Sequence, residues 1–90
     1  MKYTREDIIP GMFVKTRRFN NRNKFHEVAL ITPSEQVIIC LGENDYGWKS
    51  RNNSHFKYPE HLLKNEENTY WSISIDSILE IQTIESYEIY

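Results

Sequence analysis

The 90-residue chain is short of the residues that many catalytic sites require. Its three glycines are too few for a glycine-rich phosphate loop or a nucleophile elbow. Its one cysteine, Cys40, has no second thiol within these residues for a disulfide, and the surrounding run VIICL predicts a buried, inert side chain. The sequence therefore predicts a protein that is not an enzyme.

Histidines are present, but their spacing does not suit a metal site. The five residues FKYPE separate His55 from His61, which would not bring both rings to one face of a helix. We expect neither a metal nor another cofactor. An enzymatic alternative would require a pocket that gathers Asp45, His55 and Glu60.

Long apolar runs are also absent. No stretch reaches the length of about 18 apolar residues that a membrane-spanning helix needs, and the N-terminal MKYTREDII lacks the apolar segment of a signal peptide. We therefore expect a cytoplasmic protein without a membrane partner. The abundance of Asn, Ile, Lys and Tyr hints at a bacterial or phage source with an AT-rich genome.

What the chain does contain predicts one domain, residues 1–90, of mostly β structure. Hydrophobic residues make up 39% of the chain and aromatic residues 13%, enough for one modest core. Alternating or wholly apolar stretches predict strands at 12–17, 26–32, 36–42, 70–76 and 79–84, with a last edge segment at 87–90. In the strand at 70–76, one face is expected to point inward with Trp71, Ile73 and Ile75, and the other to face water with Tyr70, Ser72, Ser74 and Asp76.

The connections between these strands have their own signals. Thr4 and Asp7 predict one helical turn, and Pro10-Gly11 predicts a type II turn. Residues 42–69 form a long connection in which Pro59 begins a short helix over 60–66. The remainder, residues 42–58, is expected to be an exposed, aromatic-rich arm.

The order of strands and loops resembles that of SH3-like small β-barrels, over roughly residues 10 to 85. The resemblance is to the fold alone, and a Sm-like barrel is the nearest alternative. It implies a five-stranded barrel with one short helix in a long connection. It implies no function, because unrelated functions share such folds.

The charges are strongly segregated. Residues 15–26 hold five cations and residues 48–58 hold three, so eight of the eleven Lys and Arg residues lie in two segments without any Asp or Glu. Residues 66–90 hold six carboxylates and no Lys or Arg. The chain is therefore expected to have a local positive field despite its net charge of -2.

Aromatic residues accompany these cations, which favours a binding module for a phosphate-bearing ligand, either nucleic acid or a nucleotide. The predicted phosphate contacts are Arg17, Arg18, Arg22, Lys24, Lys49, Arg51 and Lys57, and the predicted stacking residues are Phe25, Trp48 and Phe56. In the alternative interpretation the loops are simply solvated and the rings fold inward. An SH3-like order also tends to separate the first and third loops, so convergence stays open.

A second hypothesis is a small protein-binding accessory or inhibitor, phage-derived, that docks on a host protein. Its contact would be the basic arm or the acidic C-terminal strands, where Tyr87, Ile89 and Tyr90 could pair as a strand edge. Such an edge also allows a homodimer.

Overall fold

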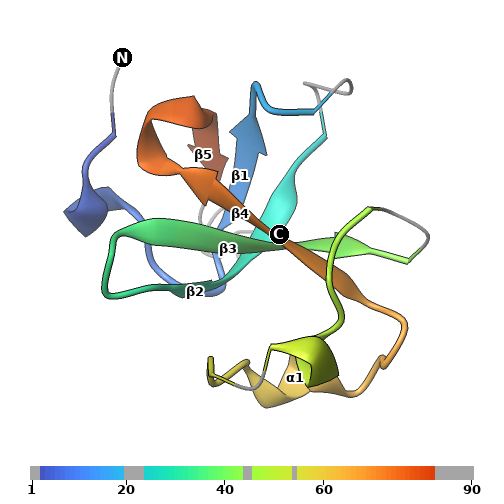
Figure 1. Cartoon of the computed structure of the whole chain (residues 1–90). Coiled ribbons are helices and arrows are strands. Elements are labelled where there is room, and N and C mark those ends of the chain that lie inside the picture. The colour runs from blue at the N-terminus through green and yellow to red at the C-terminus, as the bar shows by residue number, and fades with distance from the viewer. Residues whose placement is uncertain (1–2, 20–23, 44–45, 54, 83–90) are drawn as a thin grey trace, which may run out of the picture.

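The computed structural model describes residues 3–19, 24–43, 46–53 and 55–82, and its main element is one antiparallel sheet (Figure 1). The strands are β1 (Phe13–Thr16), β2 (His26–Ile31), β3 (Gln36–Gly42), β4 (Thr69–Ser74) and β5 (Ile78–Gln82). Their spatial order is β4-β3-β2-β1-β5. The mostly β class and the five strands are thus confirmed, whereas the predicted edge segment 87–90 lies outside the described residues.

Within the described ranges, four short helical elements lie between or before the strands. They are the 3₁₀ helices η1 (Arg5–Asp7), η2 (Ser50–Asn52) and η3 (Ile75–Ser77), and the α-helix α1 (Glu60–Leu63). The helix α1 follows Pro59 as predicted, but it is shorter than the expected 60–66. The predicted turn at Pro10-Gly11 is confirmed, because Gly11 has a φ of 97° that a side chain would disfavour.

Apolar residues pack on both faces of the central strands. One cluster draws on all five strands and the N-terminal segment, and consists of Ile8, Met12, Val14, Val28, Val37, Ile39, Leu41, Ile73 and Ile78. The other lies on the opposite face of β2, β3 and β4, and consists of Ala29, Ile38, Tyr58, Leu62 and Tyr70. These two clusters explain why β2 and β3 are apolar without alternation.

The second cluster is covered by the long connection, residues 43–68. Trp48 pairs with Tyr70 on the outer edge of β4 through two backbone hydrogen bonds of 3.0 and 2.8 Å. Gly47 allows this approach, because a Cβ there would collide with the carbonyl oxygen of Tyr70. Two expectations are therefore wrong: β4 has no wet face at Tyr70, which is 1% exposed, and Tyr58 is 6% exposed rather than part of an open arm.

The first connection, residues 17–25, leaves the sheet at the same end as the long connection. Glu27 at the start of β2 pairs with Cys40 near the end of β3, and Gly42 pairs with Thr69 at the start of β4. The first and third connections therefore lie at the same end of the sheet, not at opposite ends as an SH3-like order suggested. The reason is that β1 to β4 are successive antiparallel strands, so every second connection returns to the same end.

The sheet has two edges, β4 and β5, and no hydrogen-bonded pairing joins them within the described ranges. No helix in the described part of the chain has the length and apolar character needed to cross a membrane.

Candidate binding surface

Arg17 and Arg18 follow β1 on a backbone that buried hydroxyl groups hold in place. The Arg17 amide donates to the carbonyl oxygen of Ser77 at 3.0 Å, and the Arg18 amide donates to Thr16 Oγ1 at 3.2 Å. The Thr16 hydroxyl itself lies 3.1 Å from both the carbonyl oxygen and Oγ of Ser77, and both residues are buried. The two arginine side chains therefore leave from fixed backbone positions.

These arginines open into a surface cavity of about 540 Å³, called here the arginine cavity. Its lining residues are Arg17, Arg18, Phe19, Tyr46 and Trp71. It contains no carboxylate, and neither arginine forms an ion pair with any carboxylate in the described part of the chain. Tyr46 comes from the long connection, so the first and third connections do meet here.

Two of the rings in the arginine cavity pack against a neighbouring ring, and two of its three rings are exposed to solvent. Phe19 packs against the buried His26 ring, with centroids 5.3 Å apart. Trp71 is 39% exposed, and its ring centroid lies 6.1 Å from that of Trp48. Tyr46 is 97% exposed. Such rings offer open faces on which a planar group can stack.

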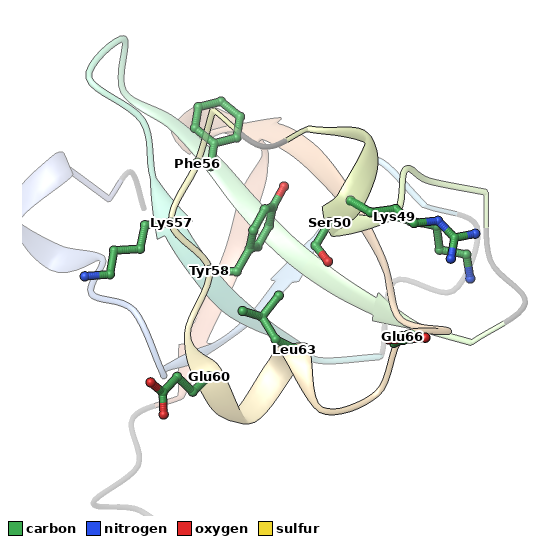
Figure 2. A pocket seen from close by; sticks show the side chains of 9 residues that line it. Lys49, Ser50, Phe56, Lys57, Tyr58, Glu60, Leu63 and Glu66 are labelled. Carbon is green, nitrogen blue, oxygen red and sulfur yellow. The ribbon is translucent and has the colours of Figure 1, made fainter.

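A second cavity, of about 580 Å³, lies beside α1 and is called here the helix cavity (Figure 2). It is lined by Lys49, Ser50, Arg51, Phe56, Lys57, Tyr58, Glu60, Leu63 and Glu66. Figure 2 shows the apolar side chains between outward-pointing charged ones. Four predicted site residues thus gather here, but two carboxylates accompany them.

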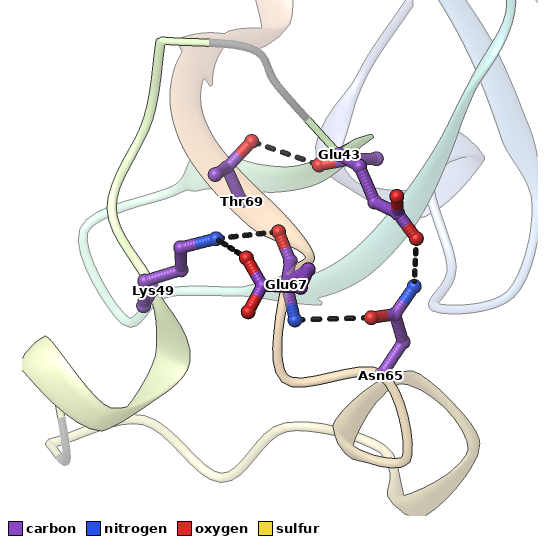
Figure 3. A network of polar contacts seen from close by, with 6 residues as sticks. Glu43, Lys49, Asn65, Glu67 and Thr69 are labelled. Carbon is purple, nitrogen blue, oxygen red and sulfur yellow. Dashed lines mark hydrogen bonds and ion pairs between the residues drawn. The ribbon is translucent and has the colours of Figure 1, made fainter.

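The cations of the helix cavity are not equivalent. Lys49 Nζ donates to the carbonyl oxygen of Glu67 at 2.6 Å and lies 3.3 Å from its Oε2 (Figure 3). Asn65 extends this network to Glu43 and to the Glu67 amide. Lys49 is therefore engaged within the fold, whereas Arg51 and Lys57 are exposed and pair with none of the described carboxylates.

Trp48 and Phe56 line a third cavity of about 430 Å³. Trp48 Nε1 donates to the Tyr58 hydroxyl at 2.8 Å, and burial raises the pKa of that hydroxyl. Burial likewise raises the pKa of Tyr70 to about 12, and its hydroxyl donates to the Leu62 carbonyl at 3.3 Å. Both predicted rings are half-buried, so they cover the sheet while keeping part of their surface open.

The remaining predicted residues lie apart from these cavities. Phe25 is half-buried, and Lys15 Nζ lies 5.0 Å from its ring centroid while pairing with Glu80 at 3.1 Å. Lys24 is exposed, and neither it nor Phe25 lines the cavities described above. Arg22 lies outside the described residues.

The described ranges include two side chains of types that often react, the thiol of Cys40 and the imidazole of His61. Burial raises the pKa of the Cys40 thiol, which keeps it protonated near neutral pH. His61 Nε2 contacts Glu27 Oε2 at 2.5 Å, which ties α1 to β2. No group of three His, Cys, Asp or Glu side chains suited to a metal ion occurs among these residues.

The sequence reasoning missed Trp71 as a site residue. Its alternation with Ile73 predicted an inward ring, and Ile73 is indeed buried. Trp71, however, lies on the edge strand β4, opposite Ile39, where the ring emerges beside Trp48. A tryptophan near the start of a strand can lie exposed when that strand is at the edge of the sheet. The sequence alone did not show that β4 is an edge strand, so this signal could not be used.

Comparisons of this chain with protein-family models, with curated protein sequences and with solved structures each found no match.

Proposed function

We propose that the protein is a non-catalytic binding module that holds a phosphate-bearing ligand with a nucleobase at the arginine cavity. The observation that carries this proposal is the meeting of two arginines with three aromatic rings in a cavity that no described carboxylate lines, where neither arginine pairs with a described carboxylate. Arg17 and Arg18 would bind phosphate, and Trp71, Tyr46 and Phe19 would stack on the base.

Physical chemistry favours this ligand class over a simple anion. A guanidinium group matches phosphate geometry with two parallel hydrogen bonds. Each base that stacks on an aromatic ring contributes about 1–3 kcal/mol. Since the chain has a net charge of -2, the local concentration of cations is what would draw an anionic ligand to this end of the sheet.

We further propose that the architecture is an SH3-like barrel. The order β4-β3-β2-β1-β5 and the single 3₁₀ turn η3 between β4 and β5 support it. One core cluster includes Ile73 of β4 and Ile78 of β5, the two edge strands, and this is the basis for preferring a barrel to an open sheet.

Fluorescence anisotropy tests the binding proposal. Labelled single-stranded RNA, single-stranded DNA, duplex DNA and nucleotides are titrated with the protein at low salt. We expect binding by at least one single-stranded probe, weakened about tenfold or more by the double variant R17Q/R18Q, equivalent to about 1.4 kcal/mol. The variant K64Q removes an exposed cation that lines neither the arginine cavity nor the helix cavity, so it should bind as the natural protein does.

Absence of binding by all four probes at low salt would reject the proposal. Equal losses for R17Q/R18Q and K64Q would also count against it, because the effect would then follow total charge rather than the cavity.

A protein partner is a second candidate function, supported by the β5 edge. Within the described residues β5 pairs only with β1, and Leu79 on it is 48% exposed. An extended peptide or a second copy of the chain could add to such an edge. Loss of a captured partner, or of a dimer measured by light scattering, in the variant L79K would favour this function.

A further inference from the structure

Aromatic rings continue from the arginine cavity around the β4 edge to the helix cavity. The Trp71 ring lies next to Trp48, with centroids 6.1 Å apart. Trp48 and Phe56 both line the third cavity, and Phe56 also lines the helix cavity. The three cavities are therefore linked by neighbouring rings, and we call this series of Trp71, Trp48 and Phe56 the aromatic track.

Each end of the aromatic track has two exposed cations without a described carboxylate partner. Arg17 and Arg18 lie at one end, and Arg51 and Lys57 lie at the other. Tyr46 and Arg51 are five residues apart in the chain, so their Cα atoms are separated by at most about 18 Å. The two pairs of cations are thus close enough for one extended ligand.

The middle of the aromatic track offers polar groups as well as rings. Asn53, Ser72 and Gln36 line the third cavity beside Trp48. Amide and hydroxyl groups of this kind can hydrogen bond to the edges of unpaired bases. The hydrogen bond from Trp48 to Tyr58 holds the indole in place, which lowers the entropic cost of stacking on it.

Two carboxylates limit the path that a phosphate backbone could take across the helix cavity. Glu60, at the start of α1, and Glu66 both line the helix cavity, and they would repel phosphate there. A strand would therefore contact Arg51 and Lys57 and turn away from α1, rather than fill the helix cavity.

Resting on the proposed function, we infer that the ligand is a single-stranded polynucleotide that follows the aromatic track from Arg17 and Arg18 to Arg51 and Lys57. A mononucleotide would reach only one pair of cations. A duplex would keep its base faces stacked inside the helix, where these rings cannot contact them. A single strand of several nucleotides meets both requirements, as in other small β domains that take about 4–16 nucleotides.

The test measures how affinity depends on length. Anisotropy titrations use unstructured thymidine or uridine oligomers of two and eight nucleotides, each in deoxy and ribo form, together with a duplex of eight base pairs. We expect the eight-nucleotide strand to bind at least about tenfold more tightly than the two-nucleotide strand. The preferred sugar distinguishes DNA from RNA as the source of the strand.

Variants at each end of the aromatic track test whether one strand contacts both pairs of cations. R51Q/K57Q should weaken the eight-nucleotide strand about tenfold and change the two-nucleotide strand less than about twofold, whereas R17Q/R18Q should weaken both. With four phosphates neutralised, the slope of log affinity against log salt should be about -2.8 for the natural protein and about -1.4 for either double variant. K64Q serves as the charge control, and circular dichroism checks that each variant is folded.

Equal affinity for the two lengths would overturn the inference and leave the proposed function standing. An unchanged eight-nucleotide affinity in R51Q/K57Q, or tighter binding of the duplex, would overturn it as well. Failure of every probe would reject both proposals.

Discussion

The two acid-free segments of this chain have similar compositions and different structural roles. Residues 17–19 of the first connection place two arginines on an open surface, beside the half-buried ring of Phe19. In the long connection, Trp48 and Tyr58 cover the sheet, and Lys49 binds a neighbouring carboxylate and carbonyl. A basic and aromatic composition therefore does not by itself indicate a ligand.

The difference follows from what each segment must cover. The outer face of β2, β3 and β4 presents Ala29, Ile38 and Tyr70, which need apolar cover away from water. The long connection passes over this face, and its rings supply that cover. The first connection begins beside Thr16 and Ser77, whose hydroxyl groups are already satisfied, and the side chains of Arg17 and Arg18 are exposed on the surface.

The largest expected effect is on stability, from truncation of a covering ring. Tyr58→Ala should lower the free energy of unfolding by about 3–5 kcal/mol, because it removes a buried ring and the acceptor of the Trp48 indole. Tyr46→Ala, at an exposed ring of the arginine cavity, should change it by no more than about 0.5 kcal/mol. Urea denaturation measures both, and similar losses would erase the distinction between the segments.

An intermediate effect is expected where the first connection is anchored. Thr16→Val removes the hydroxyl that accepts from the Arg18 amide and contacts Ser77, at a cost of about 1–3 kcal/mol. Thr16→Ser keeps that hydroxyl and is the matched control. Thermal denaturation gives the stability, and anisotropy should show weaker binding of a single strand by the valine variant. If valine and serine variants behave alike, the hydroxyl does not position the arginines.

The smallest effect is expected at Lys49. Its side chain pairs with the exposed Glu67, and exposed ion pairs contribute up to about 1 kcal/mol. Lys49→Gln should therefore lower the free energy of unfolding by less than about 1 kcal/mol at low salt, and by less still at high salt. Arg17→Gln should not lower it measurably. A larger loss of ligand affinity in Lys49→Gln than in Arg17→Gln would reverse the assigned roles.

The local patterns of the chain predicted most of the fold. The alternation of polar and apolar residues predicted β1 and β5, and continuous apolar runs predicted β2 and β3. Pro10-Gly11 predicted the turn before β1. The path of the long connection was not predictable, because Tyr58 and Trp48 are as typical of an exposed arm as of a cover. Their burial depends on the distant Tyr70, and no local pattern reports such contacts.

The candidate site was predicted in part for the same reason. Arg17 and Arg18 stood out by composition, and the structure brings them to a cavity with rings. Trp71 did not stand out, since its exposure follows from the position of β4 at the edge of the sheet. Lys49 was expected to bind a ligand, but its pairing with Glu67 joins residues 18 positions apart.

The contact between Trp48 and Tyr70 also bears on self-association. The outer side of an edge strand such as β4 exposes backbone groups that a second chain could pair with, which is a common route to aggregation. The two backbone hydrogen bonds between Trp48 and Tyr70 occupy one position of that edge, and they require that residue 47 has no Cβ. We therefore expect a larger residue at position 47 to break this pairing and to leave part of the β4 edge open to a second chain.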